Sequence, residues 1–64
     1  MQANKLKSYM ALKGETIKSL AATVGMASKT LSEKINGKSD FTLNEAEKLI
    51  QILGIDDPAD VFFN

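Results

Sequence analysis

The chain has 64 residues, of which 44% are hydrophobic, a length and composition that suit one small globular domain rather than a disordered segment. It contains no cysteine and no histidine, which excludes disulfides and removes the usual metal ligands and acid–base groups near neutral pH. No apolar run approaches the roughly 20 residues that span a bilayer, and no signal-peptide core follows Met1. We therefore expect a soluble cytoplasmic domain without metal, cofactor or small-molecule substrate.

The formal net charge of zero conceals an uneven distribution of charge along the chain. Residues 1–39 carry seven lysines and two glutamates, a net charge of +5, whereas residues 40–64 carry one lysine and six acidic residues, a net charge of −5. The chain has no arginine. Such asymmetry is typical of contact with nucleic acid or a membrane surface, although a chance crowding of lysines gives the same pattern.

Five helical segments can be read in chain order, with little strand signal. Asn4 is expected to cap the first helix, which runs to Lys13 and is stopped by Gly14. Leu6 and Met10 lie four residues apart and form its apolar face.

The second and third helices are separated by a glycine. Thr16 caps the second helix, 17–24, and Gly25 ends it because glycine adopts the left-handed conformation that a tight turn demands. The third helix covers about 27–36. Two helices joined in this way form a helix-turn-helix, whose second helix can lie in a major groove. The side chains expected to hold this unit together are Leu20, Ala21, Val24, Met26, Leu31 and Ile35.

The last two helices have the clearest start signals. Thr42 and Glu45 form a Thr-x-x-Glu capping box at the start of the fourth helix, which Gly54 ends. Asp57 and Pro58 predict the start of a short final helix, because proline is favoured at the first helical position. The sequence as a whole therefore predicts a compact all-α domain of five helices.

The segment TIKSLAATVGMASKTLSEKINGKSDFTLNEAEKLIQILGI, with the closing DPADVFF, resembles the Cro/repressor-type helix-turn-helix family of phages and bacterial regulators. The resemblance covers nearly the whole chain and is carried by the LA-x-x-x-G core, the NGKSDFT loop and the ILGI helix end. It implies a compact five-helix, lambda-repressor-like DNA-binding domain with its helix-turn-helix at the second and third helices. It also implies a small phage or prophage-type transcriptional regulator that acts, at least on DNA, as a homodimer on a pseudo-palindromic operator.

The chain departs from the family pattern at three positions. Ile17 stands where a glutamine often contacts DNA, so that contact is lost or passes to Lys18. Ala27 replaces the serine or threonine that commonly begins the recognition helix, so Ser28 caps one residue later or the Ala27 methyl meets a thymine. Lys34 replaces an apolar residue, and we expect its stem to lie along the surface with its ammonium in water.

The face of the third helix opposite Leu31 and Ile35 is polar. In the family's geometry the N-terminal positions of this helix point at base edges, so Lys29 is expected to donate to guanine and Glu33 to accept from cytosine. An ion pair between Lys29 and Glu33 is the alternative for that glutamate. The residues predicted to read bases are Ser28, Lys29, Glu33, Ala27 and Ser32.

Phosphate contacts are predicted on either side of the recognition helix. Lys18 lies in the first turn of the second helix, where free backbone N–H groups also favour anions. The predicted phosphate contacts are Lys18, Asn36, Lys38 and Thr16. The acidic residues expected to face away from DNA are Glu45, Glu47, Asp56, Asp57 and Asp60.

Two aromatic residues near the end of the chain, Phe62 and Phe63, have different predicted roles. One is expected to close the core, and the other, exposed beside Val61, to form a dimer contact. This aromatic ending favours a complete small protein over the N-terminal domain of a longer repressor.

The same residues bear on two other classes of function, a protein-binding module and an enzyme. A protein-binding module on this scaffold, such as an antirepressor or adaptor, is favoured by the zero net charge and by Ile17 but opposed by the segregated lysines. An enzyme is disfavoured, because Glu45 and Glu47 do not share a helix face and no glycine-rich phosphate loop is present.

Overall fold

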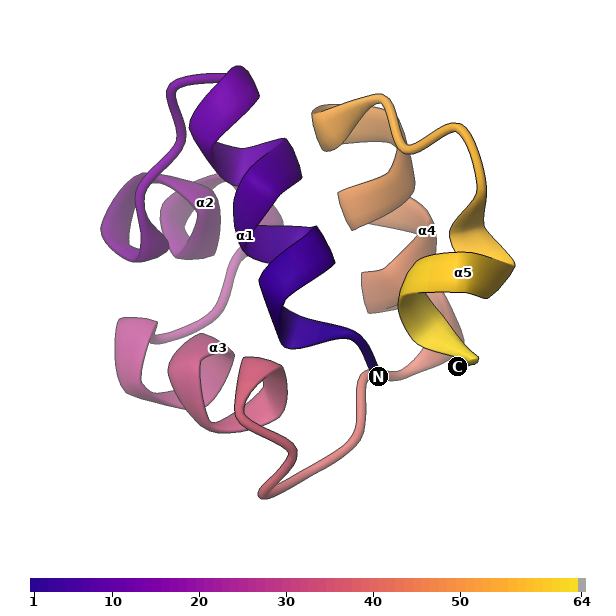
Figure 1. Ribbon diagram of the computed structural model, residues 1–64. Helices are drawn as coiled ribbons and strands as arrows, with labels where there is room; N and C mark the ends of the chain where they lie inside the picture. Colours follow the sequence, from indigo (N-terminus) through magenta and orange to yellow (C-terminus); the bar gives the residue numbers. More distant parts are fainter. Residues whose placement is uncertain (64) are drawn as a thin grey trace.

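Five helices follow one another along residues 1–63, the part of the chain that the structure, a computed structural model, describes. Their bounds are α1 (Ala3–Leu12), α2 (Ile17–Val24), α3 (Ser28–Ile35), α4 (Leu43–Leu53) and α5 (Pro58–Phe62) (Figure 1). The prediction of an all-α fold with five helices is confirmed. None of the described helices is both long and apolar enough to cross a membrane.

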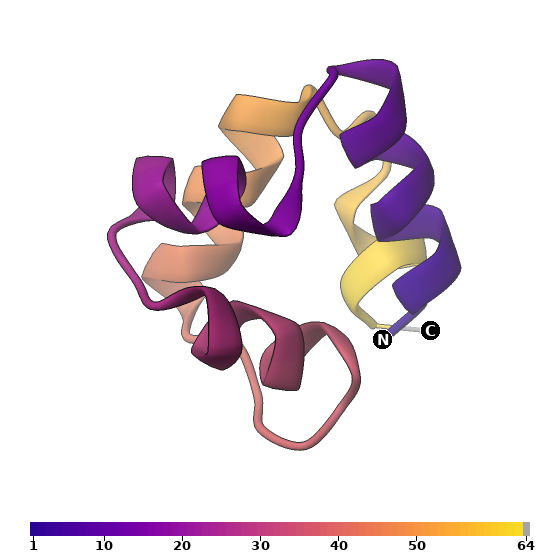
Figure 2. The same cartoon turned by 90° about the vertical axis from the view of Figure 1, so that its left-hand side faces the viewer.

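The helices form two groups that face each other across a shared core. α2 packs on α3 and on α4, while α5 packs on α1 (Figures 1 and 2). The backbone N–H of Gln2 donates to the carbonyl of Val61 at 2.8 Å, which holds the start of α1 against α5. α2 and α3 lie on the side of the molecule opposite α5 (Figures 1 and 2).

A single cluster of apolar side chains joins the described helices. Leu6, Leu20 and Leu31 are fully buried in it, although they come from three different helices. Burial of each such side chain stabilises the fold by about 1.5–3 kcal/mol. The complete set of buried residues is Leu6, Met10, Leu20, Ala21, Val24, Leu31, Ile35, Leu49, Leu53, Ile55 and Val61.

Both predicted caps on the central helices are confirmed. The Thr16 hydroxyl accepts from the Ser19 backbone N–H at 3.1 Å, and the Ser19 hydroxyl accepts from the Thr16 N–H at 2.8 Å. At the start of α4, Thr42 and Glu45 make the reciprocal pair of a capping box. Gly54 ends α4 in the left-handed conformation.

The first helix begins earlier than predicted, and the N-cap assigned to Asn4 is wrong. Gln2 occupies the N-cap position without a side-chain hydrogen bond, and Asn4 lies within the first turn. The reason is tertiary, because the bond from Gln2 to Val61 already fixes the chain where α1 starts. The other end of α1 falls within one residue of the prediction, since Lys13 is the C-cap.

Of the two aromatic residues at the end of the chain, one is packed against the core and the other is exposed, as predicted. Phe62 is half-buried, and its ring meets that of Phe41 edge to face with centroids 5.9 Å apart. Phe63 is 81% exposed. Leu43, which follows the helical apolar pattern of α4, is also exposed, because it lies in the first turn beyond the edge of the core.

Candidate nucleic-acid interface

The corner between α2 and α3 is made by Gly25. Its φ of 89° lies in the left-handed region, and its N–H donates to the Ala21 carbonyl at 2.8 Å. The N–H of Met26 donates to the same carbonyl at 3.0 Å, and the Met26 side chain packs half-buried against the core. These bonds close the end of α2 and turn the chain sharply into α3, as a helix-turn-helix requires.

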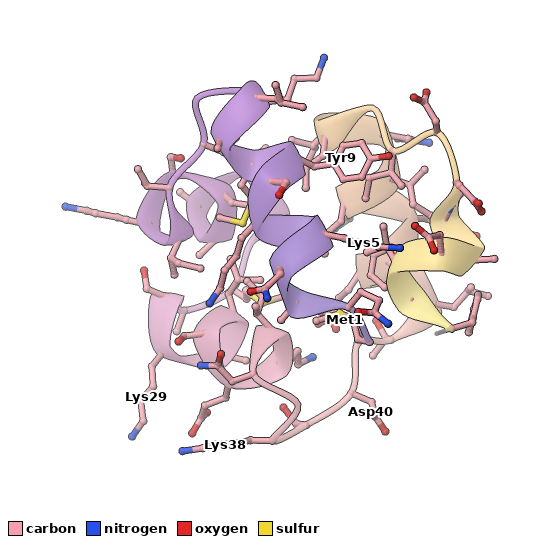
Figure 3. All side chains as sticks on the ribbon, viewed as in Figure 1. Met1, Lys5, Tyr9, Lys29, Lys38 and Asp40 are labelled. Carbon is pink, nitrogen blue, oxygen red and sulfur yellow. The ribbon has the colours of Figure 1, made fainter. Side chains whose placement is uncertain are left out.

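α3 presents a polar face to solvent. Leu31 and Ile35 are buried, as predicted, and they hold the opposite face outward. Ser28 and Lys29 are exposed, and the Lys29 side chain extends away from the molecule (Figure 3). Two further predicted base-reading residues, Ser32 and Glu33, are half-buried.

The first turn of α3 has no side-chain cap. Ala27 itself is the N-cap, so the expectation that Ser28 caps the helix one residue later is wrong. Ser28 is the first helical residue, from which its hydroxyl cannot fold back over the N-terminus as an N-cap side chain does. Among the described side chains, none accepts a hydrogen bond from the free N–H groups of this turn. These groups therefore remain available to an acceptor outside the protein.

Within residues 1–63, Lys29 and Glu33 do not form an ion pair, although they stand four residues apart on one helix. The pairing offered as an alternative for Glu33 is therefore wrong in this structure. Lys29 keeps its ammonium in solvent.

The loop after α3 is tied back to the helix. Asn36 is the C-cap, and the N–H of Lys38 donates to the Glu33 carbonyl at 2.9 Å. Gly37 takes a φ of 83° between them. The exposed Lys38 side chain points outward from this loop, and so does the exposed carboxylate of Asp40 (Figure 3). The loop therefore carries one exposed cation near α3 and one exposed anion further along, toward α4.

The start of α2 carries the other predicted phosphate contacts. Lys18 is exposed there, while the Thr16 hydroxyl is engaged in its own cap. The structure also places a carboxylate here that the sequence did not predict. The Ser19 hydroxyl donates to Glu15 at 2.7 Å. Ile17 is half-buried and packs against the core, which gives this departure from the family pattern a packing role.

Lys34 does not hold its ammonium in water, so that expectation is wrong. Its Nζ lies 2.5 Å from Oε1 of Glu45, and its side chain is only 13% exposed. Glu45, which was expected to face away from DNA, therefore contacts the last turn of α3. The hydrogen bond from Lys34, together with the backbone N–H of Thr42, holds the pKa of the Glu45 carboxyl below its usual range.

The sequence indicated where each of these two residues lies on its own helix, but not that they pair. Lys34 stands three residues after the buried Leu31, at the border of the inward stripe of α3, and Glu45 belongs to the capping box that follows soon after. Nothing in the sequence alone shows that the two side chains meet, because their contact depends on how α3 and α4 lie in space.

Of the remaining acidic residues of the second half, Glu47 is exposed on α4 and the other three lie at or next to α5. Asp56 and Asp57 are exposed just before and at the start of α5, and Asp60 forms an ion pair with Lys5 of α1 (Figure 3). Since α5 lies opposite α2 and α3, these three carboxylates are remote from the polar face of α3.

A comparison with known proteins agrees with this geometry. A family model described as the Cro/C1-type HTH DNA-binding domain matches residues 5–62. No curated protein and no solved structure gave a significant match. The family match spans all five described helices except the first two residues of α1, and it includes the glycine corner and the outward face of α3. The chain therefore belongs to the Cro/C1-type helix-turn-helix family of DNA-binding domains.

Proposed function

We propose that the protein is a sequence-specific regulator of transcription of the phage or prophage type, which inserts α3 into the major groove of double-stranded DNA. The observation that carries the proposal is the outward, uncapped and polar first turn of α3, held by buried Leu31 and Ile35. In this arrangement Lys29 and Ser28 meet base edges first, with Ala27, Ser32 and Glu33 beside them.

Phosphate contacts on both sides of α3 seat the domain on the duplex. Lys38 and Asn36 approach one strand from the loop after α3, and Lys18 with Thr16 approaches from the start of α2. The Glu15 carboxylate stands beside the site at the start of α2, and Asp40 is exposed further along the same loop as Lys38. They weaken attraction to DNA in general, so the protein depends on base contacts and DNA shape for a useful affinity.

The test is selection from a randomised duplex library, followed by binding measurements on the recovered duplex and on a scrambled one over a range of salt. We expect an enriched sequence with two inverted half-sites and an affinity that falls linearly on a log–log plot against salt. Recovery of no sequence, together with no salt-dependent binding to any duplex, rejects the proposal.

We further propose that two copies pair on the DNA through an apolar surface next to the loop that follows α3. A groove of about 540 Å³ opens there between the start of α4 and the end of α5. Its rim carries Phe63 and Leu43, which are 81% and 74% exposed. A two-fold axis at this groove lets the exposed ring of each copy enter the groove of the other. The patch is small beside a stable interface, which agrees with pairing that DNA completes.

The protein-binding alternative keeps one observation in its favour. Glu15 lies beside the start of α2 and Asp40 is exposed on the loop after α3, so carboxylates accompany the lysines that the DNA-binding proposal assigns to phosphates. The same selection experiment decides between the two, because an adaptor enriches no duplex sequence.

A further inference from the structure

Two ion pairs link helices in the described chain, and they differ in their surroundings. Lys34 and Glu45 join α3 to α4, with side chains 13% and 23% exposed. Lys5 and Asp60 join α1 to α5 with the same 2.5 Å separation, but their side chains are 48% and 37% exposed. The pair at α3 is therefore the more shielded from water, and its electrostatic attraction is screened less.

The attachment of α3 to the rest of the fold is uneven. It packs extensively on α2, whereas no comparable packing joins it to α4 in the part of the chain described. Leu31 and Ile35 anchor α3 to the core. They stand four residues apart and therefore lie almost on one line parallel to the helix axis. Apolar contacts along a line resist separation better than they resist rotation about that line, because hydrophobic attraction has no direction.

Lys34 supplies a contact away from this line. At 3.6 residues per turn it lies about 60° around the helix from Leu31. Its partner is itself held in place, because the second interaction of the Glu45 carboxylate is with the N–H of Thr42 at 2.9 Å. The ion pair therefore fastens the last turn of α3 to the first turn of α4, whose position is set by the buried Leu49 and Leu53.

We propose that Lys34 and Glu45 are positioning residues that fix the rotation of α3 about its axis, and through it the sequence specificity of DNA binding, without touching DNA. The proposal rests on the proposed function. A rotation of about 20° displaces the surface of a helix by about 2 Å. That exceeds the range of distances within which a hydrogen bond to a base edge forms.

The test compares Lys34→Met and Glu45→Gln with the matched control Lys5→Met, which breaks the exposed ion pair instead. The probes are the duplex selected by the wild type and a scrambled duplex, at a temperature where every variant is folded. We expect both variants at the α3 pair to reduce the ratio of the two affinities about tenfold, whereas the control leaves it unchanged. Glu45→Gln is decisive, because removal of a negative charge by itself raises affinity for every duplex alike.

If Lys34 instead contacts DNA phosphate directly, the variants show a different pattern, and that pattern overturns the proposal. Lys34→Met would then lower the salt slope by about 0.9 for each copy bound, and Glu45→Gln would leave the affinity ratio intact. Lys34→Arg is expected to restore the ratio, because the guanidinium keeps the ion pair.

A measurement on the free protein separates this inference from the proposed function. Residual dipolar couplings report the orientation of α3 relative to α4, and we expect them to change in both pair variants and not in Lys5→Met. Unchanged couplings reject the positioning role even where DNA binding is established. Changed couplings with no DNA binding by the wild type support the positioning of α3 and reject the proposed function alone.

Discussion

At the scale of single residues, glycine is needed at position 25 because of its backbone conformation and not because space for a side chain is lacking. Its φ of 89° is left-handed, and a Cβ added there would find nothing within 4 Å. We predict that Gly25→Ala lowers the free energy of unfolding by about 1–2 kcal/mol through backbone strain alone. Urea denaturation measures the loss, and Gly25→Asn should lose less because asparagine tolerates this region. An alanine variant as stable as the wild type would contradict the argument.

Two exposed lysines near α3 are expected to differ in what they contribute to DNA binding. Lys29 lies in the first turn and Lys38 in the loop after the helix. We predict that Lys29→Ala reduces discrimination between the selected and scrambled duplexes by about 1 kcal/mol for each half-site. Lys38→Ala should weaken binding to both duplexes equally and lower the salt slope by about 0.9 for each copy. Equal effects of the two variants on discrimination would refute the division of roles.

At the scale of elements, the start of α4 combines a capping box with an ion pair, and Glu45 serves both. Its pKa in the folded protein is lowered from 4.5, first by the hydrogen bond from Lys34. A carboxyl with a lowered pKa stabilises the fold above its unfolded pKa, and this contribution disappears as the pH falls through the folded value.

We predict that Glu45→Gln, which can still cap α4, costs about 1 kcal/mol at pH 7. The difference from the wild type should shrink below about pH 4.5 and vanish once Glu45 is protonated in both states. Thermal unfolding across this range measures it. Glu47→Gln is the matched control, since Glu47 lies exposed on the same helix and has no ion pair among the described residues. A cost at pH 7 that persists at pH 2 would show that charge is not the cause.

At the scale of the whole molecule, pairing on DNA is expected to depend on the apolar patch at the end of α5. We predict that Phe63→Ser reduces cooperative binding to a two-half-site duplex about tenfold and leaves stability unchanged, because Phe63 is 81% exposed. Leu12→Ser is the control, since Leu12 is 83% exposed on α1 outside the groove. Analytical ultracentrifugation of the protein with the duplex counts the copies bound. Undiminished cooperativity in Phe63→Ser would exclude this surface.

The sequence by itself determined where most helices begin and end. Thr16, Gly25, Thr42 and Gly54 act on backbone groups within four residues of themselves, so their effect needs no knowledge of the fold. The inward stripe of α3 was equally local, because helical periodicity alone places Leu31 on one face.

Only the tertiary structure decided the contacts between helices distant in the sequence. It set the start of α1 through the bond from Gln2 to Val61, and it turned Lys34 from a solvated charge into a partner of Glu45. These outcomes depend on helix crossing geometry, which is fixed by the packing of the whole core at once and leaves no trace in the spacing of any single segment.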